Sequence, residues 1–429
     1  MSLSCPALLV AAPASGQGKT TVVAALARLH TRLGRKVVVF KCGPDFLDPQ
    51  IHAIACGSPC QNIDLWMSGE DDARWRLAEA AGTADLILIE GVMGLFDGEP
   101  SAAELASRLG IPILTVIDGA AMATSFGAIA FGLKHYRAGT PLTAVFANRV
   151  GSDYHAELLK KSLPDDIRWM GFMPRDDIAA MPERHLGLLP AAEIKDLSAR
   201  LDRMADALAK TDAAVLPPAV DFAAASPAQI APLLAGKTIA IARDAAFCFI
   251  YPANLECLLA MGATLAFFSP LTDSTLPECD AVWLPGGYPE LHGKALATNR
   301  ALWAALAKHV DSGKPLLAEC GGMMALFETL VDGEGHAHWM GSLMPGTITM
   351  QKKLAALGMQ EIAFDGQPPL RGHTFHYSSA KTSLAPFARA IRKQGASEGE
   401  PVYRQARLTA SYLHLYFPSS PAGTASLFA

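Results

Sequence analysis

Short, almost continuously apolar runs alternate with amphipathic segments over the first half of the chain. Strands that are apolar on both faces are typical of a parallel sheet, because helices cover both sides of such a sheet. The pattern therefore predicts a parallel α/β domain. Its strands are predicted at Ala7–Ala12, Lys36–Lys41, Asp85–Glu90, Ile113–Asp118 and Leu142–Asn148, with a helix over Thr20–Leu33.

The pattern changes beyond residue 190. Glu193–Lys210 is Ala-rich and amphipathic, and the following Leu216-Pro217-Pro218 indicates a linker. A second α/β series begins at Lys237. We therefore expect two α/β domains, 1–215 and 237–429, joined by a linker over 216–236, each with a mostly parallel sheet and helices on both faces. The second is predicted to contain strands at Thr238–Ala242, Thr264–Phe268, Ala281–Leu284 and Pro315–Glu319, helices at Asn254–Met261 and Arg300–Ser312, and a late strand over 410–417.

Composition narrows the functional classes. The 429 residues are 51% hydrophobic and 18% charged, which is typical of a chain with a folded core. A formal net charge of −5 without basic blocks does not favour binding to nucleic acid or to an anionic membrane. The sequence shows no signal-peptide pattern and no membrane span. Eight Cys without paired CxxC motifs predict neither a zinc site nor disulfides, so a reducing cytoplasm is expected.

The segment from Pro13 to Thr21 has the pattern of a phosphate-binding loop. It follows a predicted strand and opens a predicted helix, where backbone N–H groups can hold phosphates. The motif G-x-x-x-x-G-K-[ST] is met except that Pro13 replaces the first Gly. A Gly-rich turn that only caps a helix is the alternative. The predicted nucleotide-binding residues are Gly16, Gly18, Lys19, Thr20 and Thr21, with Lys19 on the phosphates and Thr20 on Mg²⁺.

Acidic side chains follow the neighbouring predicted strands. Asp45 and Asp48 follow the second strand, Glu90 ends the third, and Asp97 lies in the Gly-rich segment after it. Ligands bind at the carboxyl edge of open α/β sheets, and an acid at a strand end there is typical of magnesium binding. Acids after strands are also common turn and cap residues, so both interpretations stay open for Asp45, Asp48 and Asp97. Asn148 is a candidate for contact with adenine, or else a turn residue.

Glu319-Cys320-Gly321-Gly322 ends a predicted strand and opens a helix through a tight turn. A nucleophile on such a turn stands clear of the sheet, a helix N-terminus lowers a thiol pKa, and the N–H of Gly321 can face an oxyanion. A buried Cys beside a Gly turn is the alternative. The Gly-Gly loop at Gly287 can present a second N–H, and His414 on the late strand is the candidate base for the thiol.

Together these motifs resemble known enzyme families. The Gly-Gly-Tyr-Pro-Glu loop (286–290), the Cys320 elbow and the late His414 are similar to a class I glutamine amidotransferase domain. The P-loop and the segments 40–49 and 90–98 resemble dethiobiotin-synthetase-like ligases. Fused in this order, the two halves resemble the family of cobyrinic or hydrogenobyrinic acid a,c-diamide synthases. Tyr416 stands where most class I domains have the Glu that orients the histidine, a departure that the corrinoid branch of amidotransferases shares.

The resemblance implies an ATP- and Mg²⁺-dependent carbon–nitrogen ligase that takes ammonia from glutamine. A corrinoid carboxylate becomes an acyl phosphate, which ammonia converts to the amide, on the a and c acetates in turn. The corrinoid and glutamine are the implied partners, and a homodimer is possible. The implied catalytic residues are Cys320, His414, Asp45, Glu90 and Asp97, the oxyanion donors lie near Gly287 and Gly321, and the metal ligands are Thr20, Asp48 and Glu90.

Three other functions stay open. Two are enzymes of the same chemistry, a cobyric acid synthase and a nickel-tetrapyrrole a,c-diamide synthase. The third is a non-catalytic P-loop switch with a degenerate amidotransferase module, against which intact Cys320 and His414 argue. Candidates for holding a polyanionic substrate are Lys41, Arg149, Arg175 and Arg184.

Overall fold

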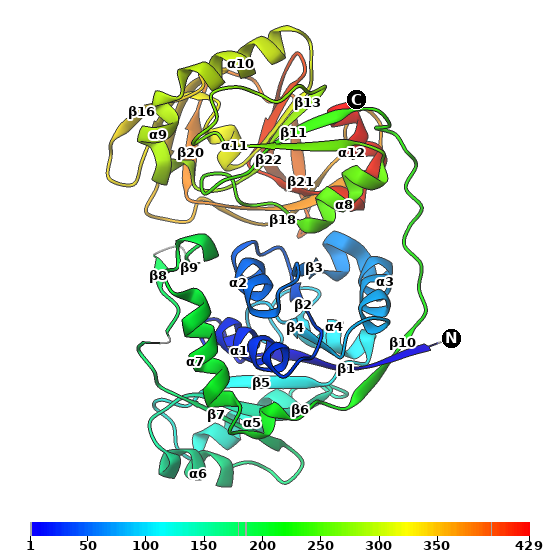
Figure 1. Cartoon of the computed structure of the whole chain (residues 1–429), viewed down its shortest axis with the longest axis vertical. Helices are drawn as coiled ribbons and strands as arrows, with labels where there is room; N and C mark the ends of the chain where they lie inside the picture. The colour runs from blue at the N-terminus through cyan, green and yellow to red at the C-terminus, as the bar shows by residue number, and fades with distance from the viewer. Residues whose placement is uncertain (1, 179, 185–186, 396) are drawn as a thin grey trace. The chain divides into compact units, whose positions relative to one another are not determined.

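The computed structural model describes residues 2–178, 180–184, 187–395 and 397–429. The chain divides into two compact units, Met1–Ala228 and Gln229–Ala429, which we call unit 1 and unit 2. In Figure 1 unit 1 runs from blue to green and unit 2 from green to red. Both units are α/β, as the sequence pattern predicts. No helix in the described part of the chain is long and apolar enough to cross a membrane.

Unit 1 is built on a parallel sheet in the order β3-β2-β4-β1-β5-β6-β7. Its strands are β1 (Ser2–Ala11), β2 (Val37–Cys42), β3 (Gln61–Ile63), β4 (Leu86–Glu90), β5 (Ile113–Asp118), β6 (Leu142–Val150), β7 (Arg168–Pro174), the pair β8 (Glu183–Arg184) and β9 (Gly187–Leu188), and β10 (Ala219–Ala223). Its α-helices are α1 (Lys19–Arg32), α2 (Leu47–Cys56), α3 (Glu70–Ala81), α4 (Ala102–Leu109), α5 (Ser125–His135), α6 (Asp153–Lys161) and α7 (Leu197–Leu208), with shorter helical turns at Leu65–Gly69, Ala191–Glu193 and Asp212–Ala214.

Helices cover both faces of this sheet. Along β1, Leu8 and Val10 enter one core together with α1, α2 and α7, whereas Leu9 and Ala11 enter the other with α3 to α6. Successive strand residues point to opposite faces, so a strand covered on both sides is apolar throughout. The predicted strands are confirmed for this reason. The loops after β1, β2, β4 and β6 leave the carboxyl edge, where ligands of open α/β sheets bind.

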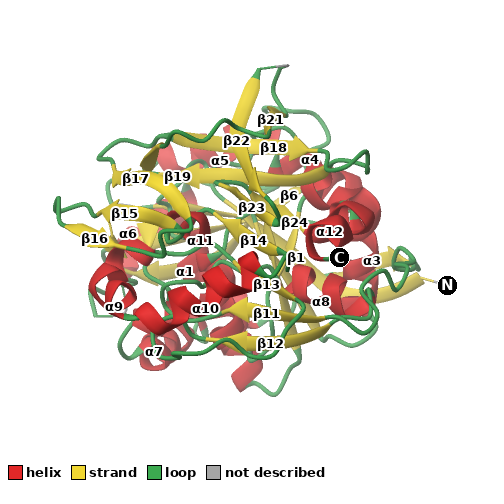
Figure 2. Cartoon of the chain, turned by 90° about the horizontal axis from the view of Figure 1, so that it is seen from above, coloured by secondary structure: helices red, strands yellow, loops and turns green. Residues whose placement is uncertain are grey.

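Unit 2 is built on a longer sheet in the order β12-β11-β13-β14-β23-β22-β21-β18-β19-β24. The first five of these strands are parallel, as predicted for β11 to β14, and follow one another in Figure 2. The sheet then continues through the antiparallel strands β22, β21, β18 and β19, which were not predicted from the sequence, and ends at β24. A smaller sheet has the order β16-β15-β17-β20.

The remaining bounds complete unit 2. Its strands are β11 (Thr238–Ala242), β12 (Thr264–Phe268), β13 (Ala281–Leu284), β14 (Leu316–Glu319), β15 (Phe327–Val331), β16 (Ala337–Trp339), β17 (Met344–Met350), β18 (Ala356–Ile362), β19 (Leu370–His376), β20 (Ser378–Lys381), β21 (Ala388–Arg392), β22 (Glu398–Gln405), β23 (Leu408–Ser411) and β24 (His414–Tyr416). Its α-helices are α8 (Pro252–Ala260), α9 (Gly293–Thr298), α10 (Arg300–Asp311), α11 (Gly321–Met324) and α12 (Pro421–Phe428), with turns at Pro289–His292 and Phe417–Ser419.

Two cores enclose the parallel half of the unit 2 sheet. One contains Ile239, Trp283 and residues of α8 and α12, and the other contains Val282, Leu302 of α10 and Met323 of α11. The predicted strand over 410–417 is wrong in one respect, because it is interrupted between Ser411 and His414. Its first part, β23, pairs with β14, and its second part, β24, pairs with β19. Because of this break, His414 pairs with β19 and not with β14.

The segment predicted as a linker contains a strand. Residues 219–223 form β10 and pair antiparallel with residues 2–6 of β1. Val220 and Phe222 are buried in the core of unit 1 while their neighbours are exposed. This alternation over five residues is the signal of a strand with one buried face, and the two prolines before it led the sequence analysis to a linker instead. The domain ends at 215 and 237 stay a prediction.

Candidate active sites

The P-loop lies between β1 and α1, as predicted. Gly18 precedes α1 with φ +88°, a conformation that residues with a Cβ rarely adopt. Lys19 is buried at the start of α1, and its Nζ donates to the carbonyl oxygens of Met93 (2.6 Å) and Ala14 (3.4 Å). Burial lowers the pKa of Lys19. Thr21 is half-buried in the first turn of the same helix.

Glu90 is the centre of a buried polar cluster beside the P-loop. Its Oε1 accepts from the Thr20 hydroxyl at 2.8 Å and lies 3.1 Å from Lys41 Nζ. Lys41 Nζ also lies 2.6 Å from Asp48 Oδ2. The imidazole Nε2 of His52, which the sequence analysis did not single out, contacts the second Glu90 oxygen. Three elements, α1, β2 and α2, thus place polar side chains around the end of β4.

The buried ionisable groups of this cluster have pKa values shifted in different directions. Burial disfavours the charge of Lys41, but Asp48 and Glu90 outweigh it and hold the Lys41 pKa well above its usual range. Burial acts against ionisation of Glu90 too, yet Lys41 and His52 hold its pKa well below the usual range. Burial and the negative charges of Asp45 and Glu90 raise the pKa of Asp48 to about 8. Of two acids that compete for one ammonium group, Glu90 is the ionised one.

Asp45 and Asp97 have local structural contacts. Asp45 Oδ1 accepts from the backbone N–H of Leu47 (2.7 Å) and of Asp48 (3.0 Å), so it caps the start of α2. Asp97 Oδ2 accepts from the N–H of Gly94 at 2.9 Å within the loop after β4. Both contacts are those of turn and cap residues, and a catalytic role for either stays a prediction.

The end of β6 braces the P-loop. Asn148 Nδ2 donates to the carbonyl oxygen of Gln17 at 2.9 Å, and a Cβ on Gly18 would lie 2.1 Å from the same nitrogen. Arg149 Nη1 donates to the carbonyl oxygen of Gly16 at 3.0 Å and to Asp118 at 2.7 Å. Asn148 therefore contacts the loop itself, and its predicted contact with adenine stays a prediction. Arg175 is exposed and pairs with Asp177, whereas the side chain of Arg184 lies outside what the structure describes.

Cys320 forms a tight elbow between β14 and α11, with φ +46° and ψ −108°. A non-glycine residue rarely adopts such a backbone, which is characteristic of functional sites. The elbow packs against the loop after β13, because a Cβ on Gly321 would lie 2.8 Å from the backbone N of Gly287. A Cβ on Gly322 would lie 2.1 Å from the carbonyl oxygen of Leu284. The two predicted oxyanion residues, Gly287 and Gly321, are thus neighbours.

The predicted lowering of the thiol pKa is wrong. Cys320 is 5% exposed, and burial together with the negative charge of Glu290 raises its pKa far above the usual range. The N–H of Gly321 acts in the opposite direction but is outweighed. Since α11 has only four residues, its dipole is too weak to offset burial. The thiol is therefore protonated at neutral pH.

His414 lies in β24 next to the same Gly-Gly loop. A Cβ on Gly286 would lie 2.3 Å from its Cε1 and 2.9 Å from its Nδ1. Burial lowers the pKa of His414 well below its usual range, and His373 and His376 add to this effect. The loop 286–287 thus contacts both the elbow and His414. A neutral thiol and a neutral imidazole therefore lie beside the same loop.

Glu319 ties the elbow to the strand of His414. Its Oε1 accepts from the backbone N–H of Leu415 at 2.8 Å, and its Oε2 accepts from the indole N–H of Trp283 at 2.9 Å. Burial raises the pKa of Glu319 to about 8. The sequence analysis gave no role to this residue, although its place directly before Cys320 put it at the site.

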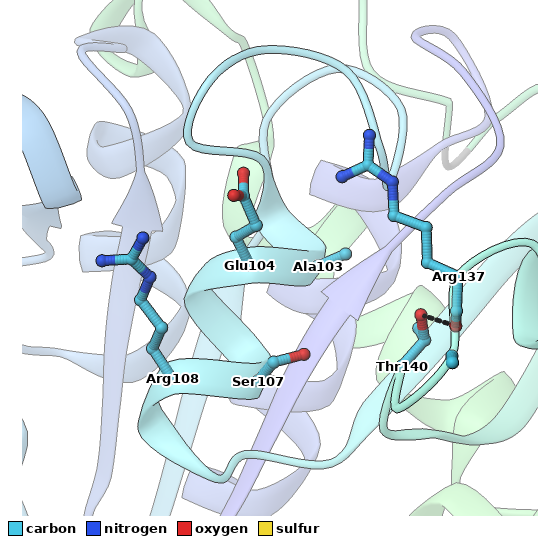
Figure 3. Close-up of a pocket in the computed structure, with 7 residues that line it drawn as sticks. Ala103, Glu104, Ser107, Arg108, Arg137 and Thr140 are labelled. Carbon is cyan, nitrogen blue, oxygen red and sulfur yellow. Dashed lines mark hydrogen bonds between the residues drawn. The ribbon is translucent and has the colours of Figure 1, made fainter.

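A shallow pocket on unit 1 involves none of the predicted site residues (Figure 3). Its volume of about 180 Å³ is below the roughly 300 Å³ at which small-molecule sites begin. Its polar side chains are exposed or half-exposed, and the Thr140 hydroxyl donates to the Arg137 carbonyl oxygen as part of a local turn. The lining residues are Ala103, Glu104, Ser107, Arg108, Arg137, Ala138 and Thr140.

The two units match two family models. Residues 8–189 match the CobQ/CobB/MinD/ParA nucleotide binding domain, and residues 238–422 match the CobB/CobQ-like glutamine amidotransferase domain. The chain is thus a nucleotide-binding unit followed by a glutamine amidotransferase unit.

Full-length relatives define the family further. The chain is 57% identical to hydrogenobyrinate a,c-diamide synthase of Stutzerimonas stutzeri over 99% of both chains. It is 55% identical to the enzyme of that name in Pseudomonas aeruginosa, over 99% of this chain and 98% of the other. It is 49% identical to cobyrinate a,c-diamide synthase of Herminiimonas arsenicoxydans, over 98% and 96%. The chain belongs to the a,c-diamide synthase family.

Proposed function

We propose that this chain amidates the a and c acetate carboxylates of hydrogenobyrinic or cobyrinic acid, with ATP as energy source and glutamine as nitrogen donor. One observation carries the proposal: a P-loop beside a buried acid cluster and a cysteine elbow beside a histidine occur in one chain of this family. The relatives from Stutzerimonas stutzeri and Pseudomonas aeruginosa, at 57% and 55% identity, are named for hydrogenobyrinate, which favours hydrogenobyrinic acid over cobyrinic acid as the substrate of this chain. A homodimer and a cytoplasmic location stay predictions.

In unit 2 we assign the glutaminase step to Cys320 and His414. His414 takes the thiol proton, and the thiolate attacks the side-chain amide carbon of glutamine. Backbone N–H groups near Gly287 and Gly321 hold the oxyanion. His414 returns the proton to the leaving nitrogen, ammonia departs, and water hydrolyses the thioester to glutamate. The ion pair exists only during the reaction, because both groups are neutral beforehand.

In unit 1 we assign nucleotide binding to the P-loop. The N–H groups of Gly16 to Lys19 hold the phosphates, and Lys19 exchanges its carbonyl partners for phosphate oxygens. The hydroxyl of Thr20 and the carboxylate of Glu90, 2.8 Å apart, are oxygen donors of the kind that Mg²⁺ takes together with phosphate oxygens. Thr20 and Glu90 therefore fit Mg²⁺, and we assign Asp48 as a further ligand. When bound, the ion neutralises charge on the phosphates.

The ligase step then uses the ATP that binds to unit 1 and the ammonia that is released in unit 2. The corrinoid carboxylate attacks the γ-phosphorus of ATP, which gives an acyl phosphate and ADP. Ammonia attacks the acyl carbon, and the amide forms with release of phosphate and a proton. Lys41, which is buried beside Asp48 and Glu90 at the end of β2, is the residue to which we assign charge neutralisation in this step.

The test is a mass measurement of the tetrapyrrole. The full chain is incubated with hydrogenobyrinic or cobyrinic acid, Mg-ATP and glutamine, and each reactant is omitted in turn. Two successive replacements of a carboxyl by a carboxamide, with one glutamate and one phosphate released each time, are expected. Glutamine and ATP hydrolysis without a mass change would move the acceptor to another tetrapyrrole. ATP turnover that never depends on glutamine would favour a P-loop switch.

A further inference from the structure

β24, the strand that carries His414, contains no acidic residue. Tyr416, two residues further on, is fully buried. Its ring packs edge-to-face on Tyr251, with centroids 5.6 Å apart. The third group of a nucleophile–base–orienting triad is therefore not supplied by β24.

A second histidine lies directly opposite His414. His373 of β19 is its Cα partner in the antiparallel pairing of β19 with β24. The two rings are stacked, with centroids 4.9 Å apart and an angle of 20° between their planes. Directly paired residues of antiparallel strands point to the same face of the sheet, so the stack follows from the backbone. His373 is 6% exposed, and burial lowers its pKa to about 3, so its ring is neutral.

His373 is itself held in place. The hydroxyl of Tyr251, a buried residue at the start of α8, lies 3.1 Å from His373 Nδ1. Close by, the Asn254 side chain donates to the carbonyl oxygen of Leu415 and accepts from the N–H of Phe417, each at 2.8 Å. The first turn of α8 thus fixes both the backbone of β24 and the ring below His414.

The Gly286 backbone and the Phe249 ring also approach His414, and the centroid of that ring lies 5.9 Å from that of the imidazole. Glu319 fixes the next residue, Leu415, through its backbone N–H. The imidazole of His414 is therefore in contact with a stacked ring, a second aromatic ring and a glycine backbone, and these contacts restrict its rotation.

We propose that His373, fixed by Tyr251, is the positioning residue for His414. This inference rests on the proposed glutaminase role of Cys320 and His414. The ring of His373 positions the base by stacking on it. His373 touches neither the thiol proton nor the substrate in this role.

The test compares three variants of the full chain. His373→Ala removes the ring, and glutaminase kcat is expected to fall by about 10- to 100-fold, part of what a positioned base contributes. The KM for glutamine is expected to change less than about threefold, because His373 does not bind substrate. His373→Phe keeps a flat ring and is expected to recover most of kcat. Tyr251→Phe loses only the hydroxyl, and its glutaminase kcat is expected to lie between the values of His373→Phe and wild type.

Controls separate this role from a loss of folding. Phe375→Ala alters an exposed ring two residues along the same strand and is expected to leave kcat unchanged. Amidation with added ammonia reports on unit 1 and is expected to be unaffected in all variants. Unchanged kcat in His373→Ala, or equal loss in the Ala and Phe variants, would overturn the positioning role. Glutamine hydrolysis that survives Cys320→Ser would instead overturn the proposed function.

Discussion

The two sites hold their reactive groups in opposite electrostatic states. In unit 1, Lys41 and Glu90 form a buried ion pair, and His52 and Thr20 bond to the same carboxylate. In unit 2, burial keeps Cys320 and His414 uncharged, and aromatic rings and backbone surround His414.

The difference follows from what each site handles. Phosphates arrive with their charge, so fixed charges that need no reorganisation are effective. A proton transfer creates charge only for a moment, and a pair that starts neutral avoids the desolvation cost of two permanent buried ions. Burial thus serves both sites, with ion pairing in one and neutrality in the other.

The sharpest test of this division is Cys320→Ser. Glutamine-dependent amidation is expected to fall by about 10³-fold or more, because the hydroxyl is a far weaker nucleophile. Amidation with added ammonia is expected to persist, since it needs only unit 1. Cys279→Ser, a change at a buried Cys of the same unit that contacts His309, is the matched control. Equal loss of both activities in Cys320→Ser would contradict the division.

The charged site is tested by Glu90→Gln. The amide cannot pair with Lys41 and His52 as the carboxylate does, so amidation is expected to fall by about 10²- to 10³-fold with either nitrogen source. Basal glutamine hydrolysis is expected to remain. Glu79→Gln, at an exposed position of α3, serves as control. A wild-type amidation rate in Glu90→Gln would remove this carboxylate from the reaction.

The neutral site is tested by Gly286→Ala. The new methyl group would lie 2.3 Å from His414 Cε1, so the imidazole has to move. A displacement of about 1 Å at a reacting group can cost roughly 10²-fold in rate, and we expect a loss of this size in glutaminase kcat. Gly333→Ala meets nothing within 4 Å and is the matched control. Similar kinetics for the two variants would show that the Gly-Gly loop does not confine the base.

The smallest expected effect concerns the stability of unit 2. Burial holds the pKa of Glu319 near 8, above that of the unfolded chain, so the folded state keeps a proton that the unfolded state releases. The stability from this proton is fully present below about pH 4.5 and is lost as pH rises through about 8, on the order of a few kcal/mol in total. Urea midpoints of wild type and Glu319→Gln, compared between pH 5 and 8, measure it. Parallel pH curves would refute the shift.

The pattern of neighbouring residues predicted those structural elements that are formed by one short segment of the chain. The parallel strands are short apolar runs, and the P-loop and the cysteine elbow each join such a run to glycines at fixed spacing. His52 and Asn254 gave no such signal, because their partners, Glu90 and Leu415, lie far along the chain. Contacts of this kind depend on which strands become neighbours.

The thiol pKa was mispredicted for a related reason. A helix N-terminus is visible in sequence, but its length and the depth of burial around Cys320 are tertiary properties. The break between β23 and β24 is similar, since the mostly apolar segment 410–417 gives no sign that its halves pair with different strands. The sequence pattern thus gave candidate residues, whereas their protonation and orientation depend on the fold.

The antiparallel pairing of β10 with β1 has a consequence for synthesis of the protein. Residues 2–6 are synthesised long before residues 219–223, and their pairing is complete only when that later segment has been made. A fragment that ends at 215 leaves the start of β1 as an open edge, which can pair with other chains. A fragment that continues beyond Ala223 carries its own closing strand. We therefore expect this fragment to remain monodisperse when it is made without unit 2.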